Sequence, residues 1–125
     1  MDTADIMTQK EEHFEKAIQW VKSKTKNEIK ARHEGYEDPK SFTNASTDEV
    51  VMPDITFTSD RGRKHYTDIV IKSDHPQQLI TKWKLLSTMA SMKQGKLHLL
   101  APRGHKSFAD RLIEQYHIEA TVHAL

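Results

Sequence analysis

A chain of 125 residues with 36% apolar residues has the size and composition of one globular domain, and its net charge of +1 gives no argument for a polyanion partner. It contains no cysteine, which excludes disulfides, thiolate zinc sites and a cysteine nucleophile. No apolar run approaches the ~20 residues needed to cross a bilayer, and the acidic start MDTADIMTQKEEHF is unlike a signal peptide. We therefore expect one cytoplasmic domain over residues 1–125, with its core at about 9–125 and no membrane partner.

The first expected element is a helix over about residues 9–34. Thr8 followed three residues later by Glu11 forms a capping box. Apolar residues then recur at helical spacing: Phe14, Ala17, Ile18 and Val21. The lysine-rich end of this segment leaves open a break near Thr25. The turn-rich stretch 35–49 should end the helix and form a surface loop.

Two segments around a basic turn predict a β-hairpin. Residues 54–59 and 65–72 alternate apolar and polar side chains with the period of two that strands show. Their apolar side chains share one face only if odd-numbered residues pair with odd-numbered ones. This register favours a three-residue loop that ends at Gly62, with a positive φ, over a two-residue turn. Asp54 then lies opposite Asp68.

The remainder of the chain alternates between helix and strand. Pro76 marks the start of a helix that should end before Gly95, and residues 96–101 form a short apolar strand. Ser107 caps a third helix, and the alternating tail 117–125 is expected to be a last strand parallel to 96–101. The expected fold is a single three-layer α/β domain, with a mixed central sheet and helices on both faces.

This order of elements, with MPDI opening one strand and IVIK closing the next, resembles the PD-(D/E)XK nuclease superfamily over roughly residues 9–125. In that family a proline and an aspartate begin one core strand, and an acidic residue, any residue and a lysine end its neighbour. Pro53, Asp54 and Lys72 match this pattern, whereas Val70 stands where the second carboxylate is required. The resemblance implies a restriction-endonuclease-like fold.

The resemblance also implies that any catalysis would depend on Mg²⁺. This ion prefers oxygen ligands at about 2.1 Å, usually one or two carboxylates with waters. Asp54 and, displaced along the strand, Asp68 would hold the ion, and Lys72 would orient the attacking water or stabilise developing charge. Side chains of the expected helices that could supply the missing ligand instead are Glu12, Glu15 and Gln78.

Three basic residues at the hairpin turn, Arg61, Arg63 and Lys64, could hold a phosphate backbone without reading sequence. The eight histidines lack an HExxH pair or a compact group, so no zinc site is expected. Because Val70 leaves the motif one carboxylate short, we expect a non-catalytic module that binds nucleic acid, a protein partner or a second copy of itself. The alternative is a Mg²⁺-dependent phosphodiesterase, a DNA nuclease that uses Asp54 and Lys72 with a displaced carboxylate.

Overall fold

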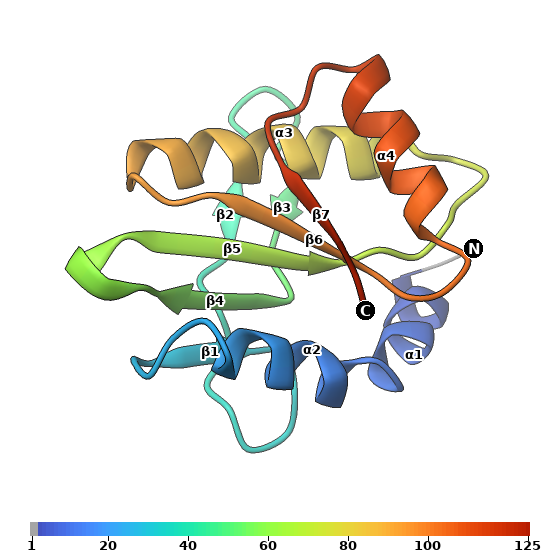
Figure 1. The fold of residues 1–125 in the computed structure, drawn as a ribbon. Helices are drawn as coiled ribbons and strands as arrows, with labels where there is room; N and C mark the ends of the chain where they lie inside the picture. The colour runs from blue at the N-terminus through green and yellow to red at the C-terminus, as the bar shows by residue number, and fades with distance from the viewer. Residues whose placement is uncertain (1–2) are drawn as a thin grey trace.

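A computed structural model describes residues 3–125, which form a single α/β domain around a five-stranded sheet of order β1-β4-β5-β6-β7 (Figure 1). The helices are α1 (Thr3–Glu11), α2 (Phe14–Lys22), α3 (Gln77–Met92) and α4 (Lys106–Gln115). The strands of the sheet are β1 (Ile29–Ala31), β4 (Ile55–Thr58), β5 (Lys64–Ile69), β6 (Leu97–Ala101) and β7 (Thr121–Ala124). β4 pairs antiparallel with β1 and β5, while β6 pairs parallel with β5 and β7, so the sheet is mixed as expected.

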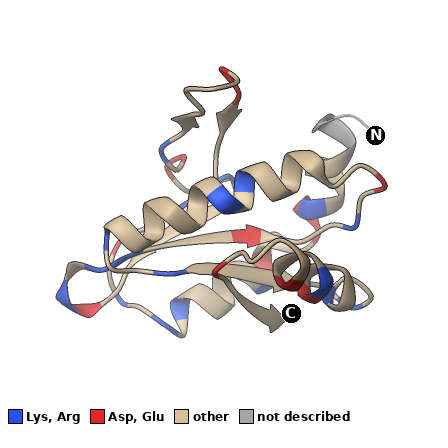
Figure 2. Cartoon of the chain, turned by 90° about the horizontal axis from the view of Figure 1, so that it is seen from above, with Lys and Arg blue, Asp and Glu red and all other residues tan. Residues whose placement is uncertain are grey.

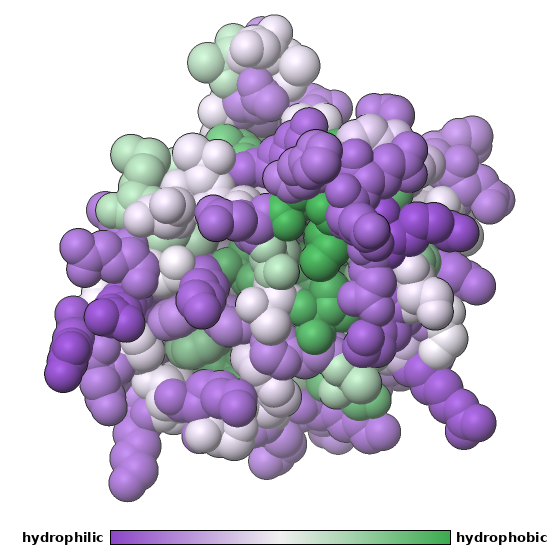
Figure 3. Space-filling view, turned by 45° about the horizontal axis from the view of Figure 1, so that its top comes forward, coloured by the Kyte–Doolittle hydropathy of each residue, from purple (hydrophilic) through white to green (hydrophobic). Residues whose placement is uncertain are grey.

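Helices cover both faces of the sheet. On one face α3 and α4 pack their apolar side chains, including Trp83 and Phe108, against Tyr66 of β5. On the other face α2 packs Phe14 against a group of strand residues that includes Ile69. Successive residues of a strand point to opposite faces, which explains why even-numbered positions of β5 face α3 and odd-numbered ones face α2. The outer surface on the α3 and α4 side is mostly hydrophilic, with apolar side chains gathered near its middle (Figure 3).

The β4–β5 hairpin has the expected register. Ile55 pairs with Thr67, odd with odd, and the connecting turn is the three-residue segment Asp60–Gly62. Gly62 has the expected positive φ, at 74°. Arg61 also lies in the left-handed region, with a φ of 73°, which the sequence did not indicate because arginine has no preference for that conformation.

The expected single helix over residues 9–34 is wrong. Its first half is divided between α1 and α2, and Thr8 lies inside α1 and does not cap its start. Two short helices are followed by an extended segment in which β1 adds an edge strand to β4. The apolar helical spacing ends at Val21, and Ala31 gains complete burial only by joining the sheet. The break that the sequence allowed near Thr25 falls in this connection, where its hydroxyl donates to the carbonyl of Thr58.

The expected surface loop over residues 35–49 is largely exposed but contains one strand of a small hairpin. β2 (Phe42–Thr43) pairs antiparallel with β3 (Val50–Val51) in a separate two-stranded sheet. This hairpin projects from the body of the domain (Figure 2). Its base is held by Phe42, whose ring packs edge-on against Tyr66 at 5.7 Å between centroids. Strands of two residues are too short to show a periodic pattern.

The elements after the hairpin agree with the sequence in type and order, but α4 begins at Lys106, so Ser107 lies inside this helix and does not cap it. α3 ends just before Gly95, β6 and β7 are parallel, and α4 connects them. A side chain at Gly95 would collide with the backbone carbonyl of Lys64, so glycine permits the close approach of this turn to β5. Within residues 3–125, no helix has the length and apolar character required to cross a membrane.

Candidate functional site

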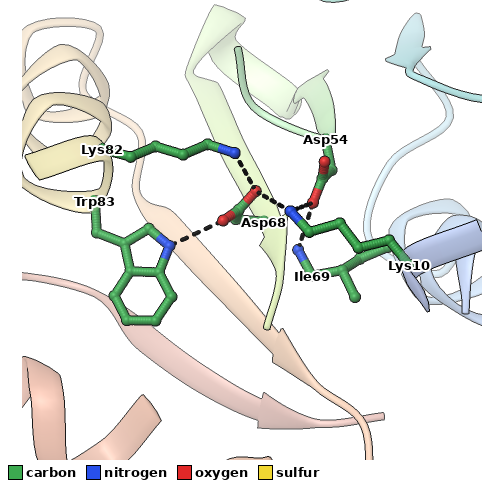
Figure 4. Close-up of polar contacts among 6 residues, drawn as sticks. All are labelled: Lys10, Asp54, Asp68, Ile69, Lys82 and Trp83. Carbon is green, nitrogen blue, oxygen red and sulfur yellow. Dashed lines mark hydrogen bonds and ion pairs between the residues drawn. The ribbon is translucent and has the colours of Figure 1, made fainter. Parts of the chain in front are cut away.

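The carboxylates of Asp54 and Asp68 lie in a buried cluster of charged side chains at one end of the β4–β5 hairpin (Figure 4). Asp54 directly precedes β4, and its backbone N–H donates to the carbonyl of Thr67 at 3.1 Å. Asp68 occupies the next position on β5. Both aspartates are 0% exposed. Because isolated buried carboxylates are costly, partners for their charge are required.

Two lysines supply that charge. The ammonium of Lys10, on α1, lies 2.8 Å from Asp54 Oδ2 and 3.4 Å from Asp68 Oδ1. The ammonium of Lys82, on α3, lies 2.9 Å from the same Asp68 oxygen. The side chain of Lys10 is only 4% exposed, and that of Lys82 is 14% exposed. Two positive and two negative side chains therefore balance one another inside the protein.

Neutral donors complete the cluster. The indole N–H of Trp83 donates to Asp68 Oδ2 at 2.9 Å, and the backbone N–H of Ile69 donates to Asp54 Oδ2 at 2.8 Å. The other oxygen of Asp54, Oδ1, is buried and has no hydrogen-bond partner among the described residues. Asp68 is thus held through both oxygens and Asp54 through one.

The surroundings of the two carboxylates shift their pKa values in opposite directions. Burial alone would raise the pKa of Asp68, but the charges of Lys10 and Lys82 outweigh it and hold that pKa below its usual range. Burial, followed by repulsion from Asp68, raises the pKa of Asp54 although Lys10 opposes the shift. Burial acts to lower the pKa of Lys10, yet the two carboxylates more than compensate and raise it. Lys10 is therefore firmly cationic.

The residues present do not fit a Mg²⁺ site. Such an ion prefers several oxygen ligands with room for water. The cluster offers two carboxylates, both already in contact with the Lys10 ammonium. Across residues 3–125 there is no group of three histidine, aspartate or glutamate side chains that could hold a metal ion. A divalent cation would have to displace a cation that the carboxylates already bind.

Lys72 and Val70 are not part of the charged cluster. Lys72 follows β5 with an exposed side chain, and its backbone N–H donates to Nδ1 of His105. No ion pair in the described part of the chain joins Lys72 to Asp54 or Asp68. Val70 is fully buried in the core beneath α3 and α4. The motif places its lysine two residues after its acidic residue. If Asp68 is taken as that acidic residue, the lysine position is therefore occupied by Val70. The lysines that contact Asp68 come from α1 and α3 instead.

The helical side chains proposed as substitute ligands lie outside the cluster. Glu12 and Glu15 are exposed, and Glu12 lies 3.1 Å from the imidazole of His13. Gln78 is also exposed. The hydrogen bonds of the described residues include none from these three side chains to Asp54 or Asp68.

The basic turn lies at the opposite end of the hairpin from the cluster. Lys64 pairs with Thr58 beside the turn, whereas Asp54 precedes the other end of β4. Arg61 and Arg63 are exposed in the turn. Three further lysines act electrostatically on Lys64: Lys30, Lys40 and Lys93. Burial, and then the charges of these three, lower the pKa of Lys64. Basic side chains therefore predominate around the turn, although Asp60 lies within it and Glu28 lies near Lys64.

Sequence reasoning missed Lys10, Lys82 and Trp83. One signal was present: Lys10 lies four residues before Phe14 and seven before Ala17, which places a lysine in line with the apolar stripe. A charged residue on a buried face requires a buried partner. The partner itself could not be read, because it lies on a strand more than forty residues away.

A row of histidines on the α2 face was also missed. His65, His98 and His123 belong to β5, β6 and β7, and consecutive rings are joined by hydrogen bonds of 3.1 Å. Trp20 of α2 packs against the rings of His98 and His123. Each histidine comes from a different strand, so their spacing in the sequence gave no sign of the row.

No family model, curated protein or solved structure matches this chain. Function is therefore inferred from the residues and their geometry.

Proposed function

We propose that this chain is a restriction-endonuclease-like domain that binds nucleic acid without cleaving it. The order of helices and strands, and the Pro53–Asp54 pair at the start of β4, support the resemblance to that fold. One observation supports the loss of catalysis above all others: the buried Lys10 ammonium contacts both carboxylates that would otherwise bind a metal ion.

The charge balance of the cluster opposes metal binding. Lys10 and Lys82 offset the charges of Asp54 and Asp68 where all but Lys82 are almost fully buried. A divalent cation added to this neutral group would introduce uncompensated charge into a site with little water, which is unfavourable. The cluster thus acts as a structural link between α1, β4, β5 and α3.

Nucleic acid is favoured over a protein partner by the surface around the β4–β5 turn. Arg61 and Arg63 project from the turn, and Lys64 lies among other lysines of neighbouring elements. Clustered lysine and arginine side chains attract phosphates through a sequence-independent electrostatic interaction. Because this surface is remote from Asp54 and Asp68, binding there would not present a phosphodiester to them.

A cleavage assay tests the absence of catalysis. Purified protein is incubated with plasmid and with single-stranded DNA in chelator, in Mg²⁺ and in Mn²⁺, and no metal-dependent product is expected. Asp68→Asn, with the exposed Asp110→Asn as its matched control, identifies any contaminating nuclease. Cleavage that requires metal and is abolished by Asp68→Asn alone would contradict the proposal.

Fluorescence anisotropy with a labelled duplex tests the binding surface. The double variant Arg61→Gln/Arg63→Gln should bind more weakly and show a shallower dependence on salt, because each lost phosphate contact reduces the slope by about 0.9. Arg103→Gln/Arg111→Gln removes the same charge from exposed positions near and on α4. Equal losses in both doubles would contradict a site at the turn. No binding at low salt would favour the protein-partner alternative.

A Mg²⁺-dependent phosphodiesterase is the second candidate, and one observation favours it. Asp54 Oδ1 is buried without a hydrogen-bond partner among the described residues, so one carboxylate oxygen still lacks a donor or a cation. If Lys10 merely blocked such a site, Lys10→Gln would create metal-dependent cleavage. The non-catalytic proposal expects none.

A further inference from the structure

A pocket of about 300 Å³ lies beside the charged cluster, on its lysine side. Five separate parts of the chain form it: α1, the segment after β1, the β3 strand with its flanking residues, the connection between β5 and α3, and the first turns of α3. Lys10, Arg32 and Lys82 line it, whereas Asp54 and Asp68 do not. Its volume is at the low end of the roughly 300–1,000 Å³ typical of small-molecule sites.

The three cations retain unused hydrogen-bond donors. A lysine ammonium has three N–H donors and an arginine guanidinium has five. Lys10 contacts the two carboxylates and Lys82 contacts one, so among the described residues donors remain on both. The guanidinium of Arg32 makes no hydrogen bond or ion pair with any other described residue. Its backbone N–H, by contrast, is fixed to the carbonyl of Asp54 at 2.9 Å.

The three cationic side chains leave the pocket with an excess of positive charge. Lys10, Lys82 and Arg32 face two buried carboxylates, which is a surplus of one positive charge when both aspartates are ionised. Glu49 also lines the pocket, but it is exposed and solvent screens its charge. An anionic ligand would offset the surplus.

Most of the remaining lining is apolar, although Ser73, His75 and Gln78 also contribute to it. Met7, Val51, Ile71 and Leu79 contribute to it from different elements. Val50, at 66% exposure one of two large apolar side chains left exposed among the described residues, also lines this pocket. Apolar surface beside a few convergent polar groups is the usual composition of a small-molecule site.

We propose that this pocket binds a small organic acid, with its oxyanion headgroup against Arg32, Lys10 and Lys82 and its apolar body against Leu79 and Val51. A carboxylate and a phosphate monoester share the required headgroup chemistry. The inference rests on the non-catalytic proposal in one respect, since Lys10 must stay in the cluster to line the pocket.

Titration followed by amide chemical shifts tests the site, with chelator present throughout. The probes are benzoate, phenyl phosphate, the neutral analogue benzyl alcohol, and inorganic phosphate. Benzoate or phenyl phosphate should shift the amides of Arg32, Leu79 and Lys82, and both benzyl alcohol and inorganic phosphate should bind at least about tenfold more weakly. The tighter of the two organic anions identifies the headgroup.

Two variants localise the effect. Arg32→Gln should weaken binding of the preferred anion by about tenfold, because a charge-assisted hydrogen bond is lost. The matched control Arg111→Gln, on the exposed side of α4, should leave binding unchanged. Val50→Ser, at an exposed position that tolerates a polar side chain, should weaken the organic anions and leave inorganic phosphate unaffected.

Several results would overturn the proposal that this pocket binds an organic acid. No shift with either organic anion, equal binding of benzyl alcohol, equal binding of inorganic phosphate, or equal effects of Arg32→Gln and Arg111→Gln would each do so. Such failure leaves the non-catalytic proposal intact, because no metal is present. Metal-dependent cleavage would instead overturn the non-catalytic proposal while the shifts in chelator persist.

Discussion

The strand β5 carries two polar networks on its opposite faces, one fully buried and one half-buried. Asp68 points to the α3 face, where full charges of both signs compensate one another. His65 points to the α2 face, where three imidazoles join across the sheet by hydrogen bonds. The first network excludes a further cation because it is already balanced. The second has no compensating carboxylate, so it is stable only while its rings are neutral.

The hydrogen bonds of the histidine row assign its tautomers. The backbone N–H of Lys96 donates to Nδ1 of His65, so that nitrogen is an acceptor and Nε2 of His98 must donate to it. By the same logic Nε2 of His123 donates to Nδ1 of His98. A proton added to His98 would set two donors against each other. The two networks should therefore differ in what breaks them.

The largest expected effect comes from removing the central cation. Lys10→Met leaves two fully buried carboxylates with one lysine fewer, and breaking such a buried pair should cost about 3 kcal/mol or more of unfolding free energy. Urea unfolding at neutral pH measures the loss. Lys16→Met, at an exposed position of α2, is the control and should change stability by less than about 0.5 kcal/mol. Equal effects would mean that Lys10 is not buried against the carboxylates.

A smaller effect should follow from removing one neutral donor. Trp83→Phe deletes the indole N–H that binds Asp68 Oδ2 and should cost about 2 kcal/mol, since hydrogen bonds to charged groups are stronger than neutral ones. Trp20→Phe on the opposite face removes a ring that contacts His98 and His123 without taking a donor from a carboxylate. Urea unfolding at pH 7 should show a larger penalty for Trp83→Phe than for Trp20→Phe. Equal penalties would argue against the bond.

Acid should break the histidine row before the carboxylate cluster. Burial, and then repulsion from His65 and His123, lower the pKa of His98 from 6.5 to about 3. The unfolded chain therefore takes up the proton first, so this stabilisation is complete above pH 6.5 and falls as the pH drops towards 3. The loss between pH 7 and pH 5 should be about 1 kcal/mol, after a discount for the partial exposure of the ring.

Urea midpoints across this pH range measure the loss, and His98→Gln should flatten the profile. The stabilisation from Asp68, whose pKa lies below its usual value of 3.8, remains until lower pH. A profile for His98→Gln that is as steep as that of the parent would show that the row does not titrate as proposed.

The smallest expected effect has the opposite sign. Thr67 lies between the two networks on β5, completely buried, and its hydroxyl has no hydrogen-bond partner among the described residues. Thr67→Val keeps the shape and removes the unsatisfied group, so stability should rise by up to about 1 kcal/mol. Differential scanning calorimetry would detect the higher melting temperature. A clear decrease would reveal a partner for this hydroxyl.

The hairpin illustrates what could be predicted from the sequence. Alternation and loop parity gave the register in which Ile55 pairs with Thr67, and with it the approach of Asp54 to Asp68. Both depend on neighbouring residues and on the fixed period of a strand. The same local reasoning failed beyond Val21, where sheet pairing with β4 decided the conformation of β1.

The residues that contact Asp54 and His65 could not be predicted from their neighbours in the sequence. Lys10 reaches Asp54 across 44 positions of the chain, and His65 reaches His98 across 33. Such contacts depend on how separate elements pack, which periodicity does not report. The motif therefore indicated that Asp54 mattered, but it implied a divalent metal ion as the partner of this carboxylate, where the structure has the Lys10 ammonium.

The central claim is that a lysine, not a metal, holds the carboxylate pair, and urea unfolding of chelator-treated protein with and without millimolar Mg²⁺ or Mn²⁺ tests it most directly. A ligand that binds only the native state raises the free energy of unfolding. We predict coincident unfolding curves, because the Lys10 ammonium already contacts Asp54 and Asp68. A metal-dependent rise in the midpoint that Asp54→Asn abolishes would contradict the account.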